Sequence, residues 1–112
     1  GNAIKITHSV NNGEYGGESM IVWDAKVESL VSWYFTTAGF YTQATMIIEN
    51  DKLVSYEKVT GNENGITEVR ATINLLSEGE LHTKSDYLQD GKWIDGHEIY
   101  YKEALDANVI FK

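Results

Sequence analysis

The chain of 112 residues contains no cysteine and no proline. Without cysteine it can form no disulfide, thiolate nucleophile, iron–sulfur cluster or cysteine-based zinc site. Without proline, no segment is barred on that account from pairing in a sheet. At this length one domain over residues 1–112 is expected. Folding should bury roughly two-thirds of the surface that the unfolded chain exposes, which suffices for a core without metal or disulfide.

Basic residues are also scarce, since nine Lys+Arg stand against seventeen Asp+Glu and give a net charge of −8. Binding to a phosphate backbone needs a basic face, and so does docking on anionic lipid. We therefore expect neither a nucleic-acid partner nor a membrane partner. No run of residues approaches the roughly 18 apolar residues of a membrane-spanning helix. No signal peptide opens the chain, although one could have been removed. The sequence leaves the compartment open, and of the alternatives we expect the cytoplasm.

Short β-type segments, rich in Thr, Tyr, Val and Ile, are what the chain does contain. We expect eight strands, at residues 3–10, 18–24, 30–37, 40–49, 52–60, 66–76, 81–88 and 92–102. The turn signals include Asn50-Asp51 and Asp90-Gly91, residue types that tolerate the positive φ of a two-residue hairpin turn. Every connection is too short for a crossover helix, so neighbouring strands must be antiparallel. The result is an up-and-down meander.

Alternation of side chains assigns faces to these strands. In segment 66–76, Val69 and Ile73 share an apolar face opposite Arg70. In segment 81–88, one face carries the hydroxyl groups of Thr83, Ser85 and Tyr87. Segments 18–24 and 30–37 are apolar on both faces, which indicates a covered outer side or an interface. A meander with one apolar face can fold over as a sandwich or close as a barrel that holds one small ligand.

Three runs resemble a group of small bacterial lipocalin-like (calycin-type) domains: residues 8–18 (HSVNNGEYGGE), 34–41 (YFTTAGFY) and 61–70 (GNENGITEVR). The resemblance covers most of the chain. It implies an all-β barrel or half-open barrel of the lipocalin and fatty-acid-binding type, and it implies no particular activity. Members of this group carry an opening segment with a Gly-x-Trp signature that plugs one barrel end. We expect this chain to lack that segment.

We expect the domain to bind a small apolar or amphipathic molecule in the barrel cavity, without catalysis and without a cofactor or metal. The residues expected to line the cavity are Met20, Phe40, Thr42, Met46, Val69, Arg70, Ile73, Thr83, Ser85 and Tyr87. Two alternatives stay open. One is an acid–base enzyme that uses a buried carboxylate in the same cavity, and the other is a structural or interaction module with no ligand.

Individual polar residues allow opposite interpretations. Arg70, the only arginine, would hold a ligand carboxylate if it pointed inward, or pair with an acid across strands if it pointed outward. Glu57 and Asp95 would be general acids if buried, and solvated surface groups otherwise. The histidines show no close spacing typical of a metal site, so we expect scattered surface or hydrogen-bonded rings: His8, His82 and His97. Strict alternation would put Asp95, and not Glu98, on the face of His97.

The apolar second and third strands also bear on assembly. Their apolar residues are Met20, Ile21, Val22, Trp23, Val31, Trp33 and Phe35. An exposed apolar patch beside an unpaired edge at residues 3–10 favours association, and we expect a two-fold homodimer through these two strands. In the alternative, the C-terminal segment 104–111 folds back over the patch, using Leu105, Val109, Ile110 and Phe111.

Overall fold

The computed structural model describes residues 2–112, which form one curled eight-stranded sheet. A short 3₁₀ turn, η1 (Asn11–Gly13), joins the first two strands. The strands are β1 (Ala3–Val10), β2 (Tyr15–Asp24), β3 (Ser29–Thr36), β4 (Tyr41–Glu49), β5 (Lys52–Thr60), β6 (Ile66–Ser77), β7 (Glu80–Gln89) and β8 (Lys92–Lys102). Each strand pairs antiparallel with the next, which confirms the all-β up-and-down meander.

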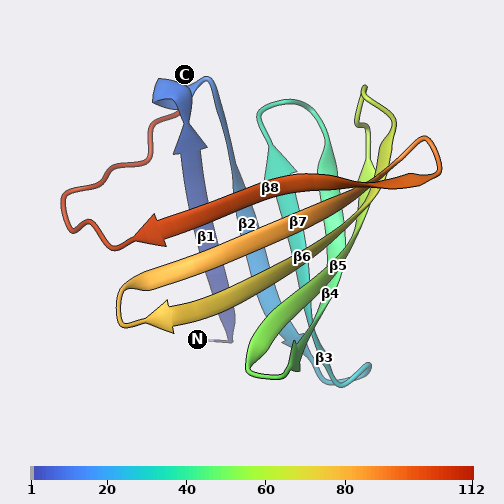
Figure 1. Cartoon of the computed structure of the whole chain (residues 1–112), viewed down its shortest axis with the longest axis horizontal. Helices are drawn as coiled ribbons and strands as arrows, with labels where there is room; N and C mark the ends of the chain where they lie inside the picture. The colour runs from blue at the N-terminus through green and yellow to red at the C-terminus, as the bar shows by residue number, and fades with distance from the viewer. Residues whose placement is uncertain (1) are drawn as a thin grey trace.

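The sheet curls into a half-open barrel. Figure 1 shows β6, β7 and β8 crossing in front of β1 and β2 at a steep angle. The order of the sheet runs from β1 to β8, and these two end strands do not pair with each other within residues 2–112. The barrel is therefore open along one side, with β1 and β8 as its free edges. Within the same residues, no helix is long and apolar enough to cross a lipid bilayer.

Two-residue turns set the register of the hairpins. Asn50 and Asp51 adopt φ of 51° and 62°, and Asp90 and Gly91 adopt φ of 51° and 81°. These left-handed conformations match the twist of the flanking strands, and Asn, Asp and Gly adopt them at low cost. The hairpins β4–β5 and β7–β8 confirm the turns predicted from these dipeptides.

We call the side of the sheet that carries Tyr34, Thr42 and Glu57 the inner face. Tyr34 lies opposite Thr42 across β3–β4, and Ala44 lies opposite Glu57 across β4–β5. The same face continues through the pairs Glu57–Val69 and Val69–Tyr87 into β6 and β7. The other side, which we call the outer face, carries the pairs Met20–Trp33, Tyr56–Arg70 and Arg70–Asp86.

The core is small and centres on β4 and β5. Its buried apolar side chains are Ala44, Met46 and Val54, and its buried polar ones are Ser32, Thr42 and Ser55. In the part of the chain that the structure describes, no large side chain is fully enclosed. Inner-face residues near the open side remain exposed, with Ile4 at 61% and Ile6 at 48%. The inner face is therefore sealed in the middle of the sheet and accessible to solvent toward its edges.

The segment after β8 returns to the first hairpin (Figure 1). The Ile110 amide donates to Ser9 Oγ over 3.0 Å, and the Lys112 amide donates to the Gly13 carbonyl over 3.3 Å. The Phe111 ring lies against Gly16, and a shallow surface pocket joins it to Phe35. The chain thus folds back in part, at the Phe35 end of the outer face.

Candidate functional site

Tyr34 is the centre of a hydrogen-bonded cluster on the inner face. Its hydroxyl oxygen lies 2.6 Å from His8 Nε2 and 2.8 Å from Tyr15 Oη, so one side chain joins β1, β2 and β3. The Phe40 ring meets the Tyr34 ring edge-on, with 6.4 Å between centroids. Gly17 makes room for the Tyr34 ring, because a Cβ at that position would lie 2.6 Å from Tyr34 Cε1. The local sequence therefore builds a slot that fits this tyrosine.

The protonation states of the cluster follow from its burial. Burial raises the pKa of Tyr34, and the hydrogen bond with Tyr15 and the nearby charge of Glu57 act in the same direction. Burial lowers the pKa of His8. At neutral pH the cluster is therefore a protonated phenol beside a neutral imidazole, and it presents hydrogen-bond donors and acceptors without net charge.

Glu57 places a carboxyl group on the same face. Thr42 Oγ1 donates a hydrogen bond to Glu57 Oε1 over 2.9 Å, and Thr42 itself is buried. The cross-strand neighbours of Glu57 are Ala44 and Val69, both apolar. Burial raises the pKa of Glu57, and the Thr42 hydrogen bond opposes that shift. No salt bridge within residues 2–112 includes this carboxylate.

Tyr87 and His97 form a second pair on the inner face. Tyr87 Oη lies 2.5 Å from His97 Nδ1, and Gly96 leaves room for the Tyr87 ring. The register of β7 and β8 shifts between Lys84 and Asp86, where β8 contains one extra residue. This β-bulge reverses the alternation, so the expectation that Asp95 shares the face of His97 is wrong. Asp95 is instead exposed on the outer face, 3.7 Å from Lys84 Nζ.

Most of the residues expected to line a cavity do share the inner face. These are Phe40, Thr42, Met46, Val69, Ile73, Thr83, Ser85 and Tyr87. Met20 lies on the outer face opposite Trp33, so it cannot line the same site. Because β2 is apolar on both faces, its alternation gave no indication of which side points inward. The pairing of β2 with its neighbours settles the direction, because Gly17 lies opposite His8 and Ser19 lies opposite Tyr34.

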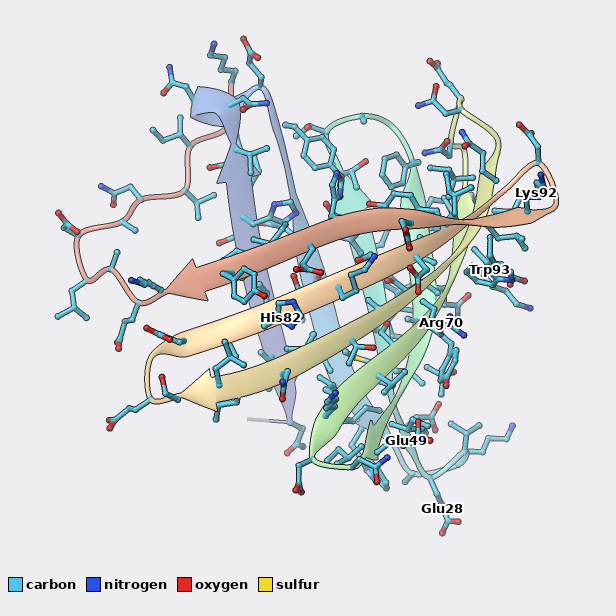
Figure 2. The ribbon with its side chains drawn as sticks, in the orientation of Figure 1. Glu28, Glu49, Arg70, His82, Lys92 and Trp93 are labelled. Atoms are coloured by element: carbon cyan, nitrogen blue, oxygen red, sulfur yellow. The ribbon has the colours of Figure 1, made fainter. Side chains whose placement is uncertain are left out.

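Arg70 also lies on the outer face. The prediction that it lines the cavity is therefore wrong, and the alternative, that it points outward and pairs with an acid across strands, is confirmed. Its Nη2 atom lies 3.3 Å from Asp86 Oδ2 on the neighbouring strand. Its guanidinium lies 5.4 Å from the centre of the Trp93 ring, and Figure 2 shows the two side chains close together. A surface pocket of about 290 Å³ lies beside them, with Tyr56, Lys58 and Glu68 among its lining residues. The pairing on the outer face satisfies Arg70 without a ligand.

The three histidines do not converge. His8 and His97 bind different tyrosines on the inner face, while His82 stacks on Tyr100 and lies 3.8 Å from Glu98 on the outer face. Within residues 2–112, no group of three His, Asp or Glu side chains could hold a metal ion. His8 and His97 are thus hydrogen-bonded rings, as predicted, whereas His82 is a partly buried ring whose Nε2 has no hydrogen-bond partner within residues 2–112.

Sequence reasoning missed Tyr34 and Tyr15 as site residues. Alternation within 30–37 does group Tyr34 with Ser32, but both faces of that segment are largely apolar. The meeting of Tyr34 with His8 requires the register of three strands, which the sequence does not specify in this region. Searches of protein families, curated proteins and solved structures find no match to the chain. The likeness to lipocalin-like domains therefore rests on the residues quoted above.

Proposed function

We propose that this domain binds a small apolar or amphipathic molecule on the inner face of its half-open barrel, as a lipocalin-like binding protein. The observation that carries the proposal is the exposure of apolar inner-face side chains beside a half-buried polar cluster. Ile4, Ile6, Leu81 and Ile99 are all at least 38% exposed. Burying apolar surface favours a complex by roughly 25 cal/mol per Å², so a ligand that covers these side chains would bind favourably.

The polar cluster supports the same proposal because it could orient a ligand. Binding sites for small molecules combine apolar walls with a few fixed polar groups. Here the walls come from β1 and from β6–β8, and the fixed groups are the Tyr34 and Tyr87 hydroxyls, with Thr83 and Ser85 on the same face. An amphipathic molecule would place its apolar part toward the open side and its polar end at the cluster.

Native mass spectrometry of protein purified from its own host tests the proposal. We expect a retained molecule as a mass above the 12.6 kDa chain, and we expect re-addition of the extracted molecule to raise the unfolding temperature. Two variants separate the faces. Ile99→Asp on the inner face should weaken binding by about tenfold or more, because it places a charge in the apolar wall. Ile47→Asp on the outer face, at similar exposure (40% against 38%), should not.

Retention of the molecule by Ile47→Asp and its loss from Ile99→Asp would support the proposal. A protein that carries no molecule, and that no apolar compound stabilises, would contradict it. Equal loss of binding in both variants would also contradict the proposal, because binding would then not depend on the inner face.

One observation favours acid–base catalysis as a second candidate. Burial raises the pKa of Glu57, and the protonated Tyr34 phenol lies near enough to interact with its charge. If the domain is an enzyme, the bound molecule should change mass on incubation with wild-type protein and should remain unchanged with Glu57→Gln. An unchanged mass in both cases leaves binding as the function.

A further inference from the structure

The inner face contains an acidic group that forms no salt bridge within residues 2–112. Glu57 is the carboxyl residue at the inner-face positions of β3, β4, β5 and β6 around the cluster. Lys58, Arg70 and Lys84 all lie at outer-face positions around Glu57, and Arg70 and Lys84 both contact Asp86 there. Lys5 and Lys112 contact Glu18 and Glu14 near the first hairpin. The inner face around Glu57 therefore selects against anions.

We propose that the polar end of the ligand is a protonated amine that pairs with the Glu57 carboxylate. This inference rests on the proposed binding function and specifies the class of molecule that the inner face takes. An amine bound there supplies the cation that the fold itself does not provide. A fatty acid is disfavoured, because its carboxylate would meet Glu57 and would find no inward arginine.

The geometry of the carboxyl leaves room for such a partner. Thr42 Oγ1 occupies one oxygen, Oε1, and the second oxygen has no hydrogen-bond partner in the described chain. Within residues 2–112, His82 Nε2 is the one side-chain nitrogen or oxygen that is fully enclosed and lacks a hydrogen-bond partner. The second Glu57 oxygen is therefore not fully enclosed. This oxygen retains some contact with solvent, where a ligand could pair with it. An ammonium group donates up to three hydrogen bonds and could use this oxygen together with a tyrosine hydroxyl.

Aromatic rings near Glu57 favour a cation as well. Tyr34 and Tyr87 both lie close enough for the Glu57 charge to affect their hydroxyls, and Phe40 packs on Tyr34. The faces of such rings attract an ammonium group, by about 0.5–1 kcal/mol at an exposed site and more where water is excluded. A carboxylate whose charge reaches two tyrosine hydroxyls, with an apolar wall on the same face, fits an aliphatic amine better than an alcohol.

A matched series of probes tests the inference: dodecylamine, 1-dodecanol and dodecanoate, each below its aggregation concentration, in 150 mM salt. We expect the wild-type protein to bind dodecylamine about tenfold more tightly than 1-dodecanol, since a charge-assisted pair replaces a neutral one. Glu57→Gln should remove that difference and leave 1-dodecanol binding unchanged. Glu68→Gln removes the same charge from the outer-face position opposite Lys58. This variant should keep the preference for dodecylamine over 1-dodecanol.

The outcomes distinguish this inference from the proposed function. If 1-dodecanol or dodecanoate binds as tightly as dodecylamine, the amine inference is wrong while binding at the inner face stands. Equal losses in Glu57→Gln and Glu68→Gln would indicate attraction to the net charge, which also overturns it. If none of the three probes binds, both proposals fail. Should Glu57→Gln not fold, the ¹³C carboxyl resonance of Glu57 in the wild-type protein decides: dodecylamine should shift it and 1-dodecanol should not.

Discussion

At the scale of single residues, Tyr34 organises the inner face. Its hydroxyl joins side chains from β1 and β2, and its ring fills the space above Gly17. Alternation could predict from the sequence that Thr42, Val69 and Tyr87 share a face, because their strands have one clearly apolar side. It could not orient Met20 or Tyr34, whose strands are apolar on both sides. Alternation also placed Arg70 on the face opposite Val69, and its pairing with Asp86, sixteen residues away, lies on that outer face.

Tyr34→Phe should destabilise the protein by about 1–2 kcal/mol, because His8 and Tyr15 lose a half-buried hydrogen-bond partner. Urea unfolding followed by circular dichroism measures the change. Tyr41→Phe is the matched control, since this outer-face hydroxyl makes no hydrogen bond to another residue within 2–112, and its effect should stay within about 0.5 kcal/mol. Equal effects in the two variants would show that the Tyr34 hydroxyl bonds contribute nothing measurable.

His8 should make stability depend on pH. Because burial lowers its pKa below the ordinary value of 6.5, the unfolded state binds the proton more tightly than the folded state does. The free energy of unfolding therefore rises with pH up to about 6.5, and this contribution is lost as the pH falls below that value. In His8→Gln the difference in stability between pH 7.5 and pH 5 should be smaller than in the wild type. Parallel pH profiles for the two proteins would contradict this.

At the scale of elements, the turns were predictable and the bulge was not. Asn50-Asp51 and Asp90-Gly91 specify their hairpins by local conformation alone, so each dipeptide suffices to predict its turn. The extra residue in β8 depends on the fit of Gly96 beneath the Tyr87 ring, which is a contact between strands. That single insertion moved His97 to the inner face and left Asp95 outside.

The C-terminal segment offers a test at the same scale. Phe111 is 46% exposed, so about half of its ring is covered where it packs on Gly16. Phe111→Ala should therefore lower the free energy of unfolding by about 1 kcal/mol. Leu105→Ala should change it by less than about 0.5 kcal/mol, because Leu105 is 95% exposed. If the two variants are equally stable in thermal unfolding, the segment does not dock on the first hairpin in solution.

At the scale of the whole molecule, the open side and the outer apolar face both leave surface to be covered. Met20 and Phe35 are exposed on the outer face of β2 and β3. The folded-back segment reaches the Phe35 end of this face. A sequence can predict that such a patch exists, because apolar residues fill both sides of these strands. It cannot predict what covers the patch, since that depends on a second surface.

We expect a two-fold dimer through the outer face of β2 and β3. Sedimentation equilibrium at micromolar concentration should give twice the 12.6 kDa chain mass. Met20→Glu should return a monomer, because it would place a carboxylate from each copy in the buried contact. A single species at the chain mass for the wild-type protein would exclude the dimer.

Methyl NMR of the protein labelled with ¹³C at isoleucine and methionine tests the inner-face binding site most directly, because the two faces carry both residue types. On addition of dodecylamine we predict that the methyl resonances of Ile6, Met46 and Ile99 on the inner face shift. Those of Met20 and Ile47 on the outer face should stay in place. Shifts confined to Met20 and Ile47, or no shift in any methyl group, would contradict a ligand site on the inner face.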